Sequence, residues 1–554
     1  MDIGLRIRGY TLQNALKFGG KPSTGAVIGK VLAEHPELKG KIKEISKIVQ
    51  KIVLDVSKLS PEQQKKEIEE SAPELLVKKA AEKRDIFSFL GIPPDQKITT
   101  AFPPGPEKYP HIGHAKALLL NHRLARQHGG RFLLRFEDTN PTTAKKEYYE
   151  AMIRDFTWLG VDWDEVLYAS DFMDLFYQKA EELIRKGLAY IDDSSAEKIK
   201  GSREKGIETP GRKRTPKENL SLWKKMLLMP EGSAIVRLKI DLSHQNTTMR
   251  DPAIFRILDA EHPRRGKKYR LWPNYDFQNA IMDSYSNIDI RLRSKEFELR
   301  NELQRWIQEH LGLRITRTYE FGRFNLEGIL SSGRIIREKI KSGELVGWDD
   351  PSLTTLAALR RRGFLPEAIS AFVLSTGVSK AEATLTWDDL IMHNRRLLDS
   401  IANRYSALFD PAEVFISGAP AGEVELHLNP NEKKGGRKLP ISSDFYLSKN
   451  DINSFHDGDI FRLMDCINVR KENNGFFYDS ESYADFKGKK IINWLPRKDN
   501  IPIEVLMPDK TVLKGIAEQT IAAAKESEVV QFERFGFCRL DRKGEMHSFW
   551  FTHK

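Results

Sequence analysis

The chain has 554 residues, too many for a single hydrophobic core, because domains usually hold about 100–200 residues. Hydrophobic residues make up 40% and charged residues 30%, and no apolar run approaches the roughly 18–20 residues that cross a bilayer, so we expect a soluble multidomain protein without a membrane partner. The net charge of +11 fits a polyanionic partner such as nucleic acid.

The N-terminus and the cysteines narrow the expected location. Residues 1–21 carry polar side chains throughout, which argues against a secretory signal and favours the cytoplasm. The two cysteines, Cys466 and Cys538, lie in apolar strand-like runs. We therefore expect buried thiols and neither a disulfide framework nor a metal site.

The first part of the chain, residues 1–95, is predicted to be a helical domain. Apolar residues recur at spacings of three and four from Gly9 to Lys83. Ser60 and Pro61 resemble an N-cap followed by a first-turn proline, so a helix is expected to restart there.

The next segment alternates between strand and helix. We predict strands at Ile98–Phe102 and Arg131–Phe136, and helices at Gly113–His128 and Thr143–Leu159. This order is typical of a parallel sheet with right-handed crossovers. The expected fold is α/β, with a doubly wound nucleotide-binding sheet whose ligands lie at the carboxyl ends of its strands.

Composition divides the rest of the chain. Residues 194–272 are predicted to be inserted between two halves of the sheet domain, 96–193 and 273–345, because a basic run and the strand-like Ala234–Ile240 interrupt the pattern. Residues 346–408 show helical periodicity again. From 409 to 554, short apolar alternations about ten residues apart predict an all-β region, a barrel or a sandwich.

The sequence Pro110-His111-Ile112-Gly113-His114 is the strongest local motif. It lies between a proline-rich turn and a predicted helix. A helix N-terminus with a glycine for close approach is a natural phosphate site, and two imidazoles beside it can donate hydrogen bonds to a transferring phosphate.

This motif and its surroundings resemble the class I glutamyl- and glutaminyl-tRNA synthetases, and the chain is most similar in organisation to the archaeal glutamyl type. The segments that carry the resemblance beyond Pro110–His114 are Leu134–Pro141, Trp158–Asp164, Tyr168–Asp171, Met249–Pro252, Tyr275–Phe277, Gly347–Pro351, Val505–Asp509 and Gln531–Gly536.

The resemblance implies a Rossmann-like catalytic domain and an antiparallel β-barrel that binds the anticodon. It places ATP, with Mg²⁺, over His111, Gly113 and His114. The implied reaction joins L-glutamate to tRNA(Glu) through a glutamyl adenylate. Archaeal members that lack a glutaminyl partner also charge tRNA(Gln).

Three residues match the amino-acid pocket of the family. Glu137 matches the position that holds the substrate ammonium, although a structural ion pair with Arg135 would also explain it. Tyr275 and Arg293 match the side-chain pocket, where a guanidinium can hold a γ-carboxylate. The competing interpretation puts Arg291 and Arg293 on an exposed strand face.

Two departures from the family pattern concern catalysis. Ser331 and Arg334 occupy the mobile second-signature loop over the phosphates, where relatives carry a lysine in place of Arg334, and a solvated turn is the alternative. Ala101 stands where the family has an arginine that helps to bind the amino acid. Lys108 or Lys116 are the candidate substitutes.

Contacts with tRNA are expected on the inserted domain and the barrel. Ala196 to Lys217 hold eight Lys or Arg against three Asp or Glu, which fits either phosphate contact or a solvated loop. Lys213 and Arg214 are our candidates there. In the barrel, Trp494 and Arg497 are candidates for anticodon contact, with a core role for Trp494 as the alternative.

Two rival functions remain open from the sequence. One is a glutaminyl-tRNA synthetase, which Arg293 disfavours because the glutaminyl enzymes lack an arginine there. The other is a non-catalytic tRNA-binding protein, which Ala101 and Arg334 would support. The N-terminal domain resembles the extension of archaeal members and is expected to contact tRNA or a partner.

Overall fold

The computed structural model describes residues 3–18, 20–72, 75, 85–326, 330, 332–429, 431 and 435–554. The chain divides into two compact units, Met1–Ser88 and Phe89–Lys554. Within the described ranges, no helix has both the length and the apolar character that crossing a bilayer requires. Ser331, one of the predicted phosphate-binding residues, lies outside these ranges.

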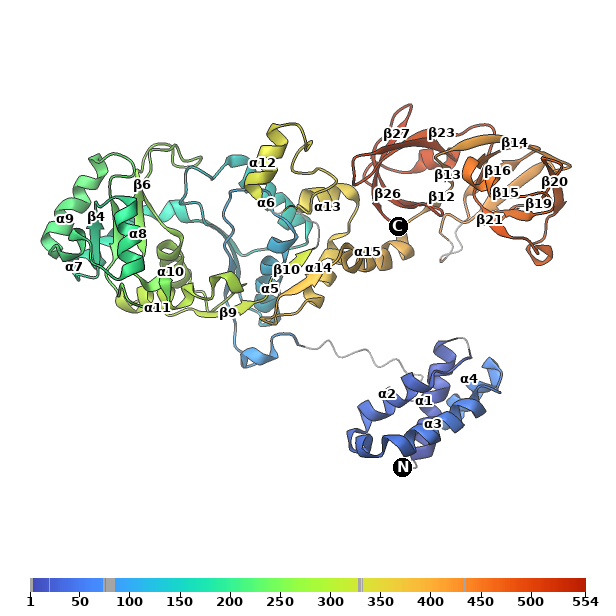
Figure 1. Cartoon of the computed structure of the whole chain (residues 1–554), viewed down its shortest axis with the longest axis horizontal. Helices are drawn as coiled ribbons and strands as arrows, with labels where there is room; N and C mark the ends of the chain where they lie inside the picture. The colour runs from blue at the N-terminus through green and yellow to red at the C-terminus, as the bar shows by residue number, and fades with distance from the viewer. Residues whose placement is uncertain are drawn as a thin grey trace. The chain divides into compact units, whose positions relative to one another are not determined.

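The N-terminal unit is a helical bundle, as the periodicity predicted (Figure 1). Its core includes Ile7, Val31 and Val49, which are buried. Ser60 and Gln63 form a capping box at the start of its last helix, so the expected restart is confirmed. The helices are α1 (Ile3–Lys17), α2 (Thr24–Glu34), η1 (Pro36–Lys41), α3 (Ile42–Val56) and α4 (Pro61–Ser71).

The larger unit contains the predicted parallel sheet. Strand β1 (Thr100–Phe102) pairs with β2 (Phe132–Phe136), and β2 pairs with β3 (Glu165–Tyr168). Helix α5 (Ile112–Gln127) crosses from β1 to β2, and α6 (Lys146–Trp158) crosses from β2 to β3. Each predicted element agrees with an observed one to within a few residues, so the α/β expectation is confirmed.

The second half of the sheet domain adds two more parallel strands. Strand β8 (Ile290–Ser294) pairs with β9 (Arg317–Phe321). The backbone N–H of Asp289 donates to the carbonyl of Thr99 at 2.9 Å, which sets β8 beside β1. Helices α10 (Tyr275–Tyr285) and α11 (Arg300–His310) belong to this half and pack against each other.

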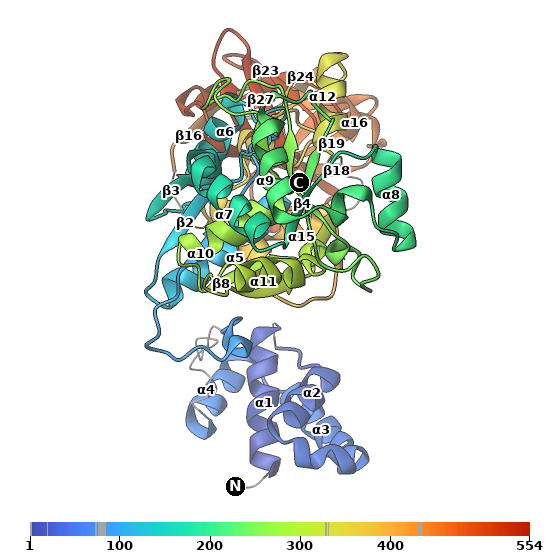
Figure 2. The same ribbon diagram turned by 90° about the vertical axis from the view of Figure 1, so that its left-hand side faces the viewer.

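An antiparallel sheet separates the two halves. It has the order β4-β5-β6-β7 and is covered by α7 and α9, which Figure 2 shows on its near side. The sheet includes β4, which the sequence analysis assigned to the preceding catalytic half. The elements are α7 (Met173–Arg185), β4 (Ala189–Asp192), α8 (Ala196–Lys205), η5 (Pro210–Lys213), α9 (Pro216–Lys225), β5 (Ile235–Leu238), β6 (Ala253–Ile257) and β7 (Leu271–Pro273).

Helices follow the parallel sheet, again as predicted, but three short strands lie within the region expected to be helical: β11 (Ala383–Leu385), β12 (Arg404–Tyr405) and β13 (Ala407–Leu408). Strand β10 (Phe324–Leu326) pairs in parallel with β11. The helices are α12 (Gly333–Lys341), α13 (Leu356–Arg362), α14 (Pro366–Ser375) and α15 (Trp387–Ile401).

The C-terminal region is built from two seven-stranded sheets and one two-stranded sheet, β15-β16 (Figure 1). In the first, the neighbouring strands β12 and β13 lie at opposite edges, so the sheet nearly closes into the expected barrel. Cys466 and Cys538 are buried, as predicted. The elements of this region are β12 (Arg404–Tyr405), β13 (Ala407–Leu408), β14 (Pro411–Ser417), β15 (Gly422–Leu426), β16 (Arg437–Ile441), β17 (Asp444–Ser448), α16 (Lys449–Asn453), β18 (Ile460–Leu463), β19 (Asn468–Glu472), β20 (Gly475–Ser480), β21 (Lys490–Ile492), β22 (Trp494–Pro496), β23 (Ile501–Leu506), β24 (Val512–Ala517), β25 (Val529–Phe532), β26 (Gly536–Arg542) and β27 (His547–His553).

Candidate active site

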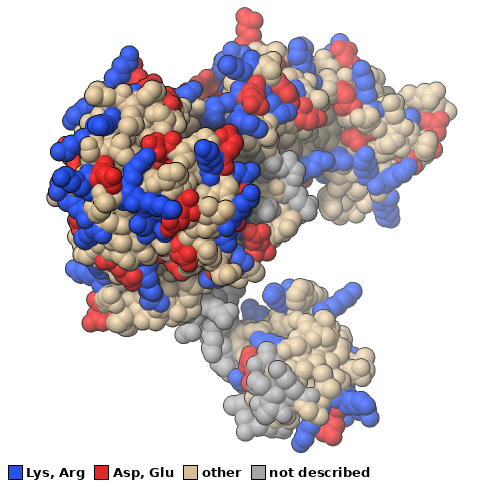
Figure 3. All heavy atoms as spheres, turned by 60° about the vertical axis from the view of Figure 1, so that its left-hand side comes forward, with Lys and Arg blue, Asp and Glu red and all other residues tan. Residues whose placement is uncertain are grey.

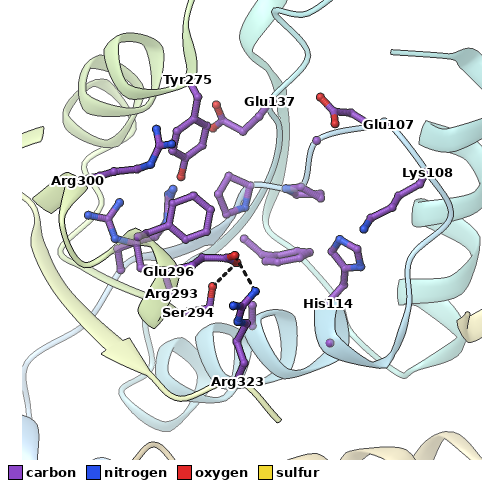
Figure 4. A pocket seen from close by; sticks show the side chains of 18 of the residues that line it. Glu107, Lys108, His114, Glu137, Tyr275, Arg293, Ser294, Glu296, Arg300 and Arg323 are labelled. Carbon is purple, nitrogen blue, oxygen red and sulfur yellow. Dashed lines mark hydrogen bonds and ion pairs between the residues drawn. The ribbon is translucent and has the colours of Figure 1, made fainter. Parts of the chain in front are cut away.

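A cavity of about 990 Å³ opens at the carboxyl ends of β1, β2 and β8 and at the N-terminus of α5. This is the edge of a doubly wound sheet at which ligands are expected. In Figure 4, Tyr275, Arg293 and Arg300 gather at one end of the cavity, and Lys108 and His114 lie at the other. We call these the arginine end and the histidine end.

The histidine end is held together by short-range hydrogen bonds. His111 is the N-cap of α5, and its Nδ1 accepts from the backbone N–H of Gly113 at 3.0 Å. The Nδ1 of His114 accepts from the backbone N–H of His111 at 3.1 Å. Because each Nδ1 is an acceptor, the hydrogen-bond network assigns the proton of each neutral ring to Nε2.

Both imidazoles are neutral near pH 7. Burial, together with repulsion from the nearby Lys108, lowers the pKa of His111 to about 3. Burial also holds the pKa of His114 well below its ordinary value, with added repulsion from His111 and Lys108. Each ring therefore presents an Nε2–H donor and carries no charge of its own.

Two lysines add positive charge at the cavity wall. Burial lowers the pKa of Lys108. Its side chain packs against Gly333 at the start of α12, so closely that a Cβ added to this glycine would lie 2.9 Å from the Lys108 Cδ. Lys116 donates to the carbonyl of Gly322 at 2.8 Å, and burial lowers its pKa to about 8. Both lysines line the cavity.

Glu137 lies at the cavity edge just after β2 and is almost fully buried. Its carboxylate accepts from Arg135 Nε at 2.8 Å and from the Gln278 amide. Burial raises the pKa of Glu137, although Arg135 opposes that shift. The ion pair considered as an alternative therefore exists, and the same carboxylate also lines the cavity.

Arg293 on β8 lines the arginine end and is only 5% exposed. Arg291 is 1% exposed, so the interpretation of both as an exposed strand face is wrong. Burial lowers the pKa of Arg293. No acceptor for its buried Nε occurs among the residues that the structure describes.

Tyr275 begins α10 and lines the same end. Burial raises the pKa of its phenol, while Arg291 and Arg293 act in the opposite direction. Arg300, which the sequence analysis did not select, also lines the cavity and pairs with Asp276 at 2.5 Å.

The residues that departed from the family pattern lie away from the cavity. Arg334 does not line it; the side chain is 81% exposed and lies 3.9 Å from Glu338, and its contact with phosphate stays a prediction. Ala101 is fully buried in an apolar cluster with Leu133 and Ile288 and does not line the cavity either.

Sequence reasoning missed two further features of the site. Arg256 on β6 brings a guanidinium from the inserted sheet to the cavity wall, and the apolar alternation around it gave no sign of this. Asp283 on α10 is fully buried and forms ion pairs with Arg135 at 2.9 Å and Arg291 at 2.7 Å. Only its place on the buried face of a helix could have suggested a polar network.

The candidates for tRNA contact differ in accessibility. Lys213 is exposed, whereas both terminal carboxylate oxygens of Asp193 accept from Arg214 at 2.9 Å. Figure 3 shows Lys and Arg side chains spread over this face of the larger unit among Asp and Glu. Arg497, which follows β22 of the second seven-stranded sheet, is half exposed and pairs with Glu413 at 2.8 Å.

Trp494 belongs to the core and not to a nucleic-acid surface. It is 1% exposed and its indole N–H donates to the carbonyl of Met464 at 3.0 Å. Because stacking on a base requires an open ring face, the anticodon role predicted for Trp494 is wrong.

Comparison with known proteins places the chain in one family over most of its length. Residues 97–400 match the family described as tRNA synthetases class I (E and Q), catalytic domain, and residues 402–477 and 491–541 match the two anti-codon binding domain families of the same group. The glutamate–tRNA ligase of Pyrococcus abyssi is 40% identical, with 98% of each chain covered. The glutamate–tRNA ligases of Pyrococcus horikoshii and Methanothermobacter thermautotrophicus are 39% and 36% identical, with 100% and 98% of each chain covered.

Proposed function

This chain belongs to the class I tRNA synthetases of the E and Q group, and we propose that it joins L-glutamate to tRNA with ATP. The observation that carries the choice of glutamate is Arg293, a buried cation that lines the cavity. A γ-carboxylate would meet this charge, whereas the neutral amide of glutamine would leave the guanidinium unpaired.

The reaction that we propose has two steps. A carboxylate oxygen of glutamate attacks the α-phosphate of ATP, which gives the glutamyl adenylate and releases pyrophosphate. A hydroxyl of the terminal tRNA ribose then attacks the acyl carbon, and AMP leaves. Mg²⁺ enters with ATP and offsets the charge of its phosphates.

The histidine end is suited to the phosphates. His111 and His114 present Nε2–H donors beside the N-terminus of α5, whose backbone N–H groups also favour anions. Because the rings are held in place by backbone hydrogen bonds, they are oriented before ATP binds, as electrostatic stabilisation of a transition state requires. Lys108 adds a positive charge at this end.

The arginine end is suited to the amino acid. Glu137 offers a carboxylate for the substrate ammonium, and Arg293 offers a guanidinium for the γ-carboxylate. Lys116 also lines the cavity and is a candidate to hold the α-carboxylate in place of the arginine that is missing at Ala101.

We propose tRNA(Glu) as the nucleic-acid substrate and tRNA(Gln) as a second acceptor. Lys213 is exposed, and Arg214 and Arg497 each pair with a partly exposed carboxylate, so all three remain candidates for phosphate contact. Arg256 supports an approach of the tRNA terminus along the inserted sheet, since it brings a cation from that sheet into the cavity.

Charging assays with labelled glutamate and glutamine on both tRNAs test the proposal, with ATP, Mg²⁺ and tRNA present throughout. We expect glutamate to be attached to tRNA(Glu) and glutamine to be rejected. Preferential charging of glutamine would overturn the argument from Arg293. Tight tRNA binding without charging of either amino acid would favour the non-catalytic alternative.

A further inference from the structure

Two amide side chains of α11 accept hydrogen bonds from Arg293 outside the cavity. Its Nη1 donates to the Gln304 side-chain oxygen at 3.1 Å, and its Nη2 donates to the side-chain oxygen of Asn301. Neither amide lines the cavity. Both terminal nitrogens of the guanidinium are therefore fixed by neutral acceptors that the substrate does not touch.

Carboxylates fix the direction in which these amides point. The NH₂ group of Gln304 donates to Asp283 Oδ2 at 2.9 Å, and the NH₂ group of Asn301 donates to Glu320 Oε1 at 2.5 Å. A carboxylate can only accept hydrogen bonds when ionised, so each amide must turn its oxygen toward Arg293. Asp283 and Glu320 are thus kept one amide away from the guanidinium.

Two other arginines near this end, Arg135 and Arg291, contact carboxylates directly. Arg135 pairs with Glu137 and Asp283, and Arg291 pairs with Asp283. Among the residues that the structure describes, no carboxylate forms an ion pair with Arg293. Arg300 pairs with Asp276, so in the described part of the chain Arg293 is the arginine of this end that lacks an ion-pair partner, and it lines the cavity.

We propose that Asn301 and Gln304 are positioning residues that set amino-acid selectivity, by orienting Arg293 through neutral acceptors and excluding protein carboxylates from contact with it. This inference rests on the proposed function and identifies why Arg293 is available to an acidic substrate. A carboxylate in direct contact would already satisfy the guanidinium, and glutamate would then have to compete with it.

An isosteric exchange tests the proposal without changing the net charge. In the double variant Asn301→Asp with Glu320→Gln, one carboxylate and one amide trade places, so that the carboxylate contacts Arg293. We expect KM for glutamate to rise at least about tenfold and the preference for glutamate over glutamine to fall by a similar factor. KM for ATP and for tRNA should stay within about twofold, a split that a general structural defect would not produce.

The single variant Glu320→Gln is the matched control. It removes the same carboxylate but leaves the amide of Asn301 beside Arg293, and Lys380 keeps its ion pair with Glu298 at 3.0 Å. An amide at position 320 can still accept from Asn301 through its oxygen, so we expect KM for glutamate to rise far less than in the double variant. If the double variant charges glutamate with the KM of the control, the proposal is overturned.

A second variant protects the test against misfolding. Gln304→Met keeps the volume but removes the acceptor for Arg293, so KM for glutamate should rise several-fold without a change in KM for tRNA. An unchanged KM for glutamate would overturn the role of Gln304. Wild-type protein that charges no glutamate would refute the proposed function, whereas normal wild-type charging with unaffected variants refutes only this inference.

Discussion

The two ends of the catalytic cavity differ in how far apart in the sequence their interacting residues lie. At the histidine end, the hydrogen bonds that orient His111 and His114 span two and three residues of one helix start. At the arginine end, Arg135 forms an ion pair with Asp283 and donates a hydrogen bond to Asn279. Asn279 lies 144 residues after Arg135 in the chain. One end is a local motif, and the other exists only when distant segments have folded together.

The two ends also differ in charge. Burial leaves the imidazoles neutral, so the histidine end offers donors with little desolvation cost. The arginine end keeps several ionised groups buried and relies on ion pairs to compensate them. Because a buried charge without its partner is costly, damage to this end should affect folding as well as catalysis.

Removal of the carboxylate of Asp283 is expected to have the largest effect. Asp283→Asn leaves Arg135 and Arg291 without a shared counter-charge, which should destabilise the chain by about 3–5 kcal/mol. Urea denaturation of the full chain measures the loss. The control is Asp162→Asn, an ion-pair partner whose side chain is 75% exposed, for which we expect at most about 1 kcal/mol. Equal losses would show that the buried network is not needed for stability.

The next largest effect is expected at the histidine end and should be catalytic. His114→Ala removes a pre-oriented donor, and kcat should fall by about 10²–10³-fold while KM for glutamate changes little. Steady-state aminoacylation measures both constants. His122 lies on the same helix and pairs with Asp162, so His122→Ala is the control and should behave like the wild type. A fall in kcat that His122→Ala reproduces would contradict a specific role for His114.

Arg293→Ala should have a smaller effect, confined to the amino acid. Loss of a charge-assisted contact worth about 1.5–3 kcal/mol corresponds to roughly a 10- to 150-fold fall in kcat/KM for glutamate. The affinity for tRNA should not change, which filter binding can measure. Arg305→Ala, an exposed position on α11, serves as the control. Parallel losses of glutamate use and tRNA binding would point to a structural role for Arg293.

The smallest expected effect is the contribution of His111 to the pH dependence of the free energy of unfolding. The pKa of His111 is about 3 in the folded chain against an ordinary 6.5, so only the unfolded chain takes up its proton between these values. The stability contributed by the neutral ring is complete above pH 6.5 and falls by about 1.4 kcal/mol per pH unit below it. His111→Gln should lose less stability than the wild type between pH 6.5 and 5.5. Identical acid dependence of the two proteins would show that His111 is not buried as described.

The same contrast explains what the sequence could predict. The helix start, expected at Gly113 and observed at Ile112, follows from residues within one turn, and the strand and helix alternation predicted the parallel sheet. The arginine end was located only through family resemblance. No local pattern links Asp283 to Arg135, and the amides of α11 look like ordinary helix residues until β8 is placed beside them.

The failed prediction for Trp494 has a physical cause. Trp494 was expected to offer a ring face, but β22 pairs with β17 and all three of its residues are buried. Strand pairing of this kind joins segments that sequence spacing alone does not identify. Arg214 donates from one nitrogen to both carboxylate oxygens of Asp193, and its contact with tRNA stays a prediction.

The division of the catalytic sheet has a consequence for synthesis on the ribosome. Thr99 and Asp289, which join β1 to β8, are 190 residues apart, so at about 5–20 residues per second the first half must wait roughly 10–40 s for its neighbour. The four antiparallel strands from β4 to β7 are complete before that time. We therefore expect the inserted sheet to form first on the nascent chain, and the cavity to be the last part of this region to close.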